Sequence, residues 1–308
     1  MIKKYKISVP KSTLNEIYKK VRNFPWSAAQ NMNGWEYGTN LNYLKNISKY
    51  WITKYNWKKF ENKINSFKNY KTKVEDINLH FIFEKSKNPN SKQLLLLHGW
   101  PGSITEFLDI IPRLAHPEKF GGKIEDGFDI IVPSLPGFGF SSQIKKALGP
   151  RKIGKILNKF MVKNLGYKNY FVQGGDWGAT IAGWIGLDSS KNCKGIHINC
   201  LPLRHPKGTK NIKEKKWEKK FNFDQIMQEG YRTQQATKPQ TLSYAMIDSP
   251  VGTAAWILEK FHGWSDLKIG KIEKTFSKDE LLSNIMIYII TKSFNTASWI
   301  YFGRRKEG

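Results

Sequence analysis

Apolar residues recur at helical spacing in the first part of the chain, up to about residue 70. Leu44, Ile47 and Trp51 fall on one face of a helix at this spacing, so we predict amphipathic helices in this segment. The segment is rich in tryptophan and tyrosine, and aromatic side chains at helical spacing usually serve packing. These aromatic residues are Trp26, Trp35, Tyr37, Tyr43, Tyr50, Trp51, Tyr55 and Trp57.

From about Val74 the pattern changes to short apolar runs bounded by glycine and proline. Apolar runs without polar alternation indicate strands that are buried on both faces, as in a parallel sheet. Helical patterns lie between the runs, and this alternation predicts right-handed βαβ units. The predicted strands are 94–97, 128–132, 170–172 and 196–198, and the helical patterns cover 107–114, 153–161 and 181–185. From about Leu203 to the end the pattern is helical and basic, so we expect an α/β fold with a mostly parallel sheet.

Composition supports a folded protein. Of 308 residues, 40% are hydrophobic and 14% aromatic, which excludes a disordered chain and allows one large domain or two smaller ones. The sequence has no apolar run long enough to span a membrane, and its start has no apolar signal segment, so we expect no membrane anchor. The two cysteines, Cys193 and Cys200, fit neither a zinc site nor a disulfide framework, which favours a cytoplasmic protein.

The formal net charge of +26 would suit a partner such as nucleic acid or an anionic membrane. The lysines, however, are spread along the whole chain. The densest stretch, Arg204 to Lys220, holds eight basic and two acidic residues, and we interpret it as a solvated helical face. No zinc-finger, RNA-recognition or helix-turn-helix pattern accompanies the charge, so we expect no nucleic-acid partner.

Two glycine-rich loops follow predicted strands. The first is His98-Gly99-Trp100-Pro101-Gly102, and the second is Gly174-Gly175-Asp176-Trp177-Gly178. The second loop has the form of a nucleophile elbow, with Asp176 in the place of the nucleophile. Side chains at 174 and 178 would collide in so sharp a strand-to-helix turn, which explains the two glycines. We expect the N-terminus of the following helix to keep Asp176 ionised and nucleophilic.

The first loop supplies the expected partner groups. We predict that His98 braces its loop and is not a general base. The backbone N–H groups of Trp100 and Trp177 are the predicted oxyanion donors. Because both loops end apolar strands, the pair is a much more specific signal than either loop alone.

These motifs resemble those of the epoxide hydrolases of the α/β-hydrolase superfamily, specifically the microsomal and juvenile-hormone type with an N-terminal lid. The resemblance implies an α/β-hydrolase fold with an N-terminal helical lid (1–72), the N-terminal part of the core (73–202) and a helical cap (203–308). The matching motifs are WEYG at 35–38, YW at 50–51, YNW at 55–57, LHF at 79–81, HGWPGS at 98–103, PSLPGFGFS at 133–141 and GGDWG at 174–178.

The resemblance also implies a chemistry, namely the opening of epoxides to vicinal diols without cofactor or metal. Asp176 would attack an epoxide carbon and form an alkyl ester. Tyr231, at the start of YRTQQATKP, and Tyr301, at the end of SFNTASWIY, match the two tyrosines that donate protons to the epoxide oxygen. The implied partner is a small apolar epoxide. The sequence does not decide between a monomer and a homodimer.

Hydrolysis of the ester requires a water molecule activated by a histidine, which in this family lies near the C-terminus. The histidines of this chain are His80, His98, His116, His197, His205 and His262, and none of them stands in a matching motif. The chain ends seven residues after Tyr301. We therefore expect a C-terminally truncated chain that lacks the last strands of the sheet, forms the ester and hydrolyses it slowly.

Two alternatives remain beside an epoxide hydrolase. One is a truncated homologue that only binds or traps an epoxide, which the missing histidine favours. The other is a haloalkane dehalogenase, which also carries Asp-Trp at the elbow, although the lid and both tyrosine contexts argue against it.

Overall fold

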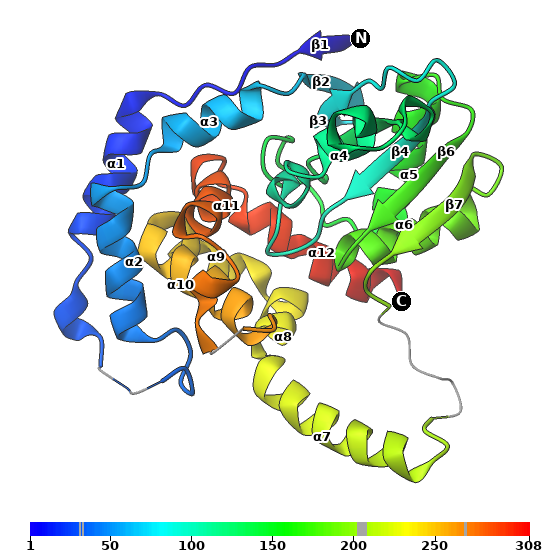
Figure 1. Cartoon of the computed structure of the whole chain (residues 1–308). Helices are drawn as coiled ribbons and strands as arrows, with labels where there is room; N and C mark the ends of the chain where they lie inside the picture. Colours follow the sequence, from blue (N-terminus) through cyan, green and yellow to red (C-terminus); the bar gives the residue numbers. More distant parts are fainter. Residues whose placement is uncertain (31, 33, 202–207, 268–269) are drawn as a thin grey trace.

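A seven-stranded β-sheet in the order β1-β2-β3-β5-β4-β6-β7 forms one side of the molecule (Figure 1). The computed structural model describes residues 1–30, 32, 34–201, 208–267 and 270–308. The strands are β1 (Ile2–Lys4), β2 (Asn69–Val74), β3 (Ile77–Glu84), β4 (Lys92–Leu97), β5 (Phe128–Pro133), β6 (Tyr170–Gly174) and β7 (Cys193–Ile198). The last four contain the four strands predicted from apolar runs, and the α/β fold is confirmed.

The sheet is mixed, so the prediction of a mostly parallel sheet was wrong in part. β4 runs parallel to β5 and β6, and β6 runs parallel to β7. The pairs β1–β2, β2–β3 and β3–β5 are antiparallel. β2 and β3 are joined by the tight turn Glu75–Asp76, with φ of 56° at Glu75, and strands joined by so short a turn must run antiparallel.

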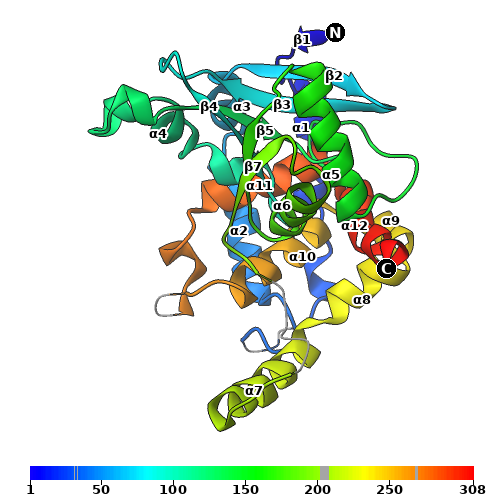
Figure 2. The same cartoon turned by 90° about the vertical axis from the view of Figure 1, so that its right-hand side faces the viewer.

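Helices cover both faces of the parallel part of the sheet. α5 (Pro150–Lys159) packs on α6 (Trp177–Asp188), and α6 contacts β4, β6 and β7. α4 (Ile111–Ala115) contacts β3 and β5 from the opposite face (Figure 2). This two-sided burial explains the unbroken apolar runs, because the side chains of Leu95 to Leu97 and Ile130 to Val132 are fully buried.

The helical pattern at 107–114 folds into two short pieces. A 3₁₀ turn, η2 (Ile104–Phe107), precedes α4, and Pro112 stands near the start of α4. Proline lacks a backbone N–H and clashes with the preceding turn, so one continuous helix could not run through it. The other short turns are η1 (Trp26–Ala28), η3 (Pro117–Phe120), η4 (Ile124–Asp126), the π turn η5 (Phe160–Asn164) and η7 (Ile272–Lys274).

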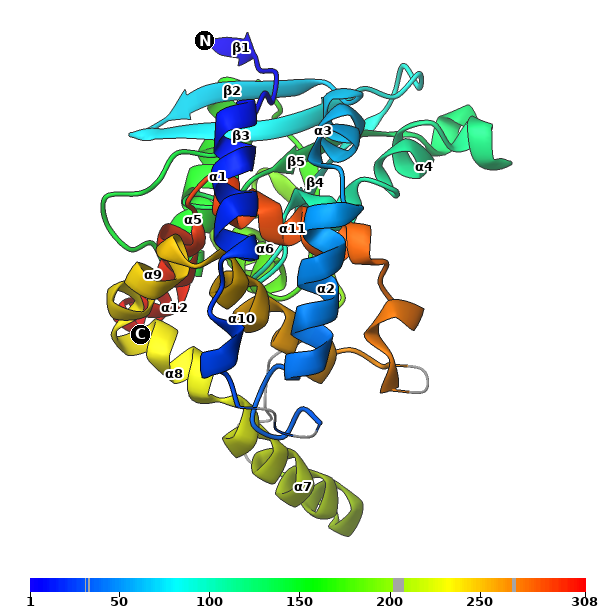
Figure 3. The same cartoon turned by 90° about the vertical axis from the view of Figure 1, so that its left-hand side faces the viewer.

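The N-terminal helices α1 (Lys11–Arg22), α2 (Leu41–Thr53) and α3 (Trp57–Asn65) pack on the helices near the C-terminus (Figure 3). The predicted apolar face of α2, Leu44, Ile47 and Trp51, is buried. The packing role predicted for the aromatic residues of this segment is confirmed for Trp57, which is buried, but it is wrong for Tyr37, which is 76% exposed. The strands β1 and β2 come from the same first part of the chain but belong to the sheet.

The C-terminal helices follow residues 202–207, which lie outside the described residues together with the predicted domain boundary at 202/203, Arg204 and His205. They are α7 (Ile212–Gln228), α8 (Gly230–Thr237), α9 (Pro239–Asp248), α10 (Pro250–Gly263), α11 (Lys278–Ile290) and α12 (Phe294–Glu307). α7 extends away from the rest of the chain, and its lysines are exposed. Within the described residues, no helix is long and apolar enough to cross a membrane.

Candidate active site

Asp176 lies in a sharp turn between the end of β6 and the start of α6. Its backbone has φ 50° and ψ −123°, a strained conformation for a residue with a side chain. A Cβ atom on Gly174 would overlap the carbonyl group of Gly178, and one on Gly178 would overlap the carbonyl oxygen of Leu97. The predicted reason for the two glycines therefore holds in the structure.

Two backbone N–H groups hold the Asp176 carboxylate. Trp100 N–H donates to Oδ1 at 2.8 Å, and Trp177 N–H also donates to the carboxylate. Desolvation by the surrounding protein atoms raises the pKa of Asp176, although both N–H groups act to lower it. The Trp177 N–H, at the N-terminus of α6, favours the ionised carboxylate, while desolvation acts on the pKa in the opposite direction and is the larger effect. That Asp176 is ionised and nucleophilic stays a prediction.

His98 braces the turn that carries Trp100. Its ring is fully buried, Nε2 accepts a 3.1 Å hydrogen bond from Leu135 N–H, and Nδ1 lies 3.0 Å from Gly99 O. Since Nε2 accepts, the proton of the neutral ring is on Nδ1, which donates to the carbonyl. Burial lowers the pKa of His98 to about 4. The ring is therefore neutral near pH 7, and both of its nitrogens are engaged by the backbone.

Helix α11 holds the same turn from the other side. Asn284 Nδ2 donates to Pro101 O at 2.7 Å, and the Tyr288 hydroxyl donates to Gly102 O at 2.7 Å. Both side chains are buried. These bonds engage the carbonyl groups of Pro101 and Gly102 and so fix the turn whose Trp100 N–H donates to Asp176.

Glu106 is a site residue that the sequence analysis missed. Its carboxylate accepts hydrogen bonds from the backbone N–H groups of Gly99 and Ser103, and Oε1 occupies the space that a Cβ atom on Gly102 would need. Desolvation by the surrounding protein atoms, and after it the negative charge of Asp176, raises the pKa of Glu106 to about 8. Part of the residue is nevertheless exposed to solvent. The available signal was Ser103-x-x-Glu106, which is also the ordinary pattern of a helix cap.

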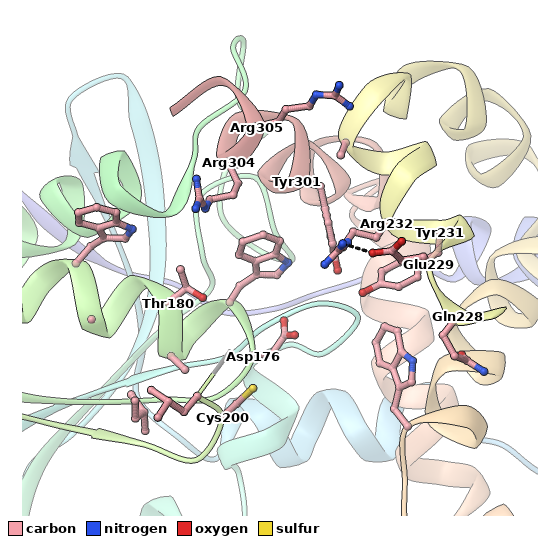
Figure 4. Close-up of a pocket in the computed structure, with 18 of the residues that line it drawn as sticks. Asp176, Thr180, Cys200, Gln228, Glu229, Tyr231, Arg232, Tyr301, Arg304 and Arg305 are labelled. Carbon is pink, nitrogen blue, oxygen red and sulfur yellow. Dashed lines mark hydrogen bonds and ion pairs between the residues drawn. The ribbon is translucent and has the colours of Figure 1, made fainter. Parts of the chain in front are cut away.

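Tyr231 on α8 and Tyr301 on α12 face the same space as Asp176 (Figure 4). The centroids of the two phenol rings are 5.7 Å apart, and the rings are nearly perpendicular. Tyr231 stacks on Trp100 at 5.3 Å, and Tyr301 meets Trp177 edge to face at 4.8 Å. Burial raises the pKa of Tyr231 to about 12 and that of Tyr301 well above 10, so both phenols keep their protons near pH 7.

These groups line a cavity of about 1060 Å³ between α6, β7 and the C-terminal helices. Its wall is largely apolar, and its polar groups are Asp176, the two tyrosines, three arginines, Glu229, Gln228 and Thr180. The apolar lining residues include Trp177, Ala179, Trp184, Leu187, Ile198, Leu201, Ala236 and Trp264, and the arginines are Arg232, Arg304 and Arg305.

None of the histidines that the structure describes lines this cavity. His80 is buried between Ser134 and Asn69, His116 lies beside Glu84, His197 is exposed on β7, and His262 stacks on Trp35 at 3.8 Å. Among the described residues there is also no group of histidine, cysteine and carboxylate side chains that could hold a metal ion. The groups closest to Asp176 are thus backbone donors, two phenols and a second carboxylate, that of Glu106.

Comparison with known proteins supports this arrangement. Residues 2–107 match the family model "Epoxide hydrolase N terminus", and residues 92–267 match "alpha/beta hydrolase fold". Epoxide hydrolase 1 of Oryctolagus cuniculus is 35% identical over 328 residues, which cover 97% of this chain and 72% of the relative. Juvenile hormone epoxide hydrolase 1 of Ctenocephalides felis is 33% identical, with 97% and 69% covered.

Among solved structures, the juvenile hormone epoxide hydrolase of the silkworm Bombyx mori superimposes with a TM-score of 0.87 at 31% identity. The match covers 98% of this chain and 77% of that one. The chain therefore shares both sequence and fold with these enzymes over nearly its whole length, and it belongs to the epoxide hydrolases of the α/β-hydrolase fold.

Proposed function

We propose that this chain opens small apolar epoxides through a covalent ester on Asp176. One observation carries the proposal: the Asp176 carboxylate, which accepts hydrogen bonds from Trp100 and Trp177 N–H, shares one cavity with two protonated phenols. A carboxylate nucleophile and proton donors on a largely apolar wall are the groups that ring opening needs.

In the first step, the Asp176 oxygen attacks one epoxide carbon and the bond between that carbon and the ring oxygen breaks. Tyr231 or Tyr301 gives its proton to the ring oxygen as it leaves, and the phenolate regains a proton from solvent. The product is a hydroxyalkyl ester on Asp176. Trp100 and Trp177 N–H hold the carboxylate before attack and are placed to stabilise the oxyanion when water later attacks the ester.

The second step, hydrolysis of the ester, needs a base. No described histidine lines the cavity, and His205 lies outside the described residues. We therefore expect the 308-residue chain to accumulate the ester and release diol slowly. A chain that only traps epoxides corresponds to the limit in which no diol is released.

Intact-mass spectrometry with a styrene-oxide-type epoxide tests the proposal. We expect a mass increase equal to one whole epoxide, because addition to Asp176 loses no atoms. Asp176→Asn should abolish the adduct, whereas Asp248→Asn, which changes an exposed carboxylate paired with Lys20, should not affect it. An undiminished adduct in Asp176→Asn would rule out this nucleophile.

A 1-bromoalkane incubated in parallel separates the haloalkane dehalogenase alternative. Attack by Asp176 on this compound would release bromide. We expect no bromide release, since the cavity offers two phenols for an oxygen leaving group. Bromide release without epoxide consumption would overturn the epoxide assignment.

A further inference from the structure

Lys260 is a buried cation beside one of the two phenols. It lies on α10, and its side chain is only 7% exposed. Its Nζ atom is 4.7 Å from the ring centroid of Tyr231 and 5.5 Å from that of Trp264. Lysine side chains are almost never fully buried without a partner, and Lys260 has Glu259 as its ion-pair partner.

The ring beneath Lys260 belongs to the aromatic group that faces Asp176. Tyr231 stacks on Trp100 at 5.3 Å and contacts Trp264 at 4.9 Å. The other charged side chains that act on Tyr231 are Asp176, Arg232 and Glu229, and Glu259 is the partner of Lys260. Arg232 pairs with Glu229 at the cavity wall, and about half of each side chain is exposed, so Lys260 is the buried cation of this set.

We propose that Lys260 is a positioning residue that promotes epoxide opening by stabilising negative charge on Tyr231 as this phenol donates its proton. The inference rests on the proposed role of Tyr231. When the proton leaves, charge spreads from the oxygen into the ring, and a cation over the ring face attracts the ring more strongly than before. An interaction that strengthens on the way to the transition state accelerates the step, whereas one of constant strength does not.

Single-turnover alkylation of Asp176 measures the effect. Lys260→Met keeps the length and apolar stem of the side chain and removes the charge. We expect it to slow alkylation by about 3- to 30-fold, the range set by cation–π attraction at partly to fully buried sites. Lys260→Arg should restore most of the rate because it keeps a cation. Should Lys260→Met fail to fold, Lys260→Gln carries the same comparison.

The matched control is Lys278→Met. The Nζ atom of Lys278 also lies over a tyrosine ring, 5.5 Å from the centroid of Tyr50, but this tyrosine is on α2 and lies outside the cavity lining. The alkylation rate of Lys278→Met should stay within about twofold of wild type, since this half-buried cation–π pair lies away from the reacting groups. Equal losses in Lys278→Met and Lys260→Met would indicate a general effect of removing lysines and overturn the proposal.

A double-mutant cycle separates the charge effect from simple packing. In a Tyr231→Phe background the ring remains but no phenol proton can leave, so Lys260→Met should cause no further loss of rate. A loss as large as in the wild-type background means that Lys260 acts through packing alone, and the proposal fails. Glu259→Gln should keep the rate near wild type, because the ammonium remains. A loss as large as in Lys260→Met would assign the effect to the ion pair and overturn the proposal.

The same experiments distinguish this proposal from the proposed function. If Asp176→Asn still forms the adduct, the nucleophile is wrong whatever Lys260 does. If Asp176→Asn is inactive and Tyr231→Phe is slow, but Lys260→Met reacts at the wild-type rate, only the role of Lys260 is refuted.

Discussion

The backbone N–H of Trp100 donates a 2.8 Å hydrogen bond to the Asp176 carboxylate, although the two residues lie 76 positions apart in the chain. This bond joins the two loops that follow β4 and β6. The strands are parallel neighbours, so their carboxyl ends meet at one edge of the sheet, where ligands bind in open α/β sheets. The loop after β4 thereby becomes part of the nucleophile site.

Gly178→Ala should prevent the site from forming, because its new methyl group would overlap Leu97 O. Overlap with a backbone atom cannot be relieved by a rotamer change, so we expect a loss of about 2 kcal/mol or more in the free energy of unfolding. Alkylation should fall with it. Denaturant unfolding and single-turnover kinetics measure the two effects.

Gly183→Ala, on the same helix, is the control for this prediction. Nothing lies within 4 Å of a Cβ atom at this position, and alanine favours a helix over glycine by about 0.5–1 kcal/mol. This variant should therefore be at least as stable as wild type. If both variants lose stability equally, the tight approach to Leu97 is not what requires glycine at 178.

Tyr231→Phe and Tyr301→Phe should each slow alkylation by on the order of 10- to 10³-fold, because the two phenols share one developing alkoxide and partly replace each other. The double variant should nearly stop the reaction. Tyr244→Phe, at an exposed position of α9, should react like wild type. A double variant with the wild-type rate would exclude the phenols as proton donors.

The sequence predicted β4 and β5 because most of their side chains are buried on both faces, and it predicted β7 from a short apolar run although Ile196 and His197 on that strand are exposed. It did not predict the antiparallel part, since β2 and β3 mix polar and apolar residues and depend on one tight turn. The elbow around Asp176 could be predicted because close backbone approach restricts two positions to glycine. Lys260 could not, because its contact with Tyr231 joins two helices whose packing the sequence pattern does not encode.

Glu106 illustrates the same limit of local patterns. Within its own segment it reads as a helix cap, and that reading is correct for its bond to Ser103 N–H. Its second bond, to Gly99 N–H, closes the loop after β4, whereas its closeness to Asp176 arises only because β4 and β6 lie side by side. Local sequence therefore shows that a carboxylate is present but not that it faces the nucleophile.

Glu106 should make the protein less stable as pH rises. Its pKa is about 8 in the folded state against an ordinary value of 4.5, so between these values the unfolded chain releases a proton that the folded chain keeps. The contribution of this group is complete below about pH 4.5 and is lost as pH rises toward 8. Solvent access to the side chain moderates the size of this loss.

Denaturant unfolding of wild type and Glu106→Gln across this pH range measures the contribution. Glutamine keeps the shape and cannot ionise, so the stability of the variant relative to wild type should increase from pH 4.5 to 8. A constant difference between the two proteins over that range would show that Glu106 titrates in the folded state as it does in the unfolded chain.

His98 should have the opposite dependence on pH. Its folded-state pKa of about 4 lies below the ordinary value of 6.5, so between these values the unfolded chain binds a proton that the folded chain cannot. Stability from this group should therefore fall as pH is lowered from 6.5 to 4, by at most about 1.4 kcal/mol per pH unit. His80, which is also buried and has a pKa lowered to about 3, should add to the loss.

His98→Gln isolates this contribution, because glutamine removes the titrating ring and can still meet one of its two backbone partners. The variant should be less stable than wild type at pH 7, where the brace between Leu135 and Gly99 is weakened. Its stability should, however, fall less steeply between pH 6.5 and 4. A variant that loses stability as steeply as wild type over this range would show that His98 is protonated in the folded protein. The ring could not then accept the Leu135 hydrogen bond, because both nitrogens of a charged imidazole are donors.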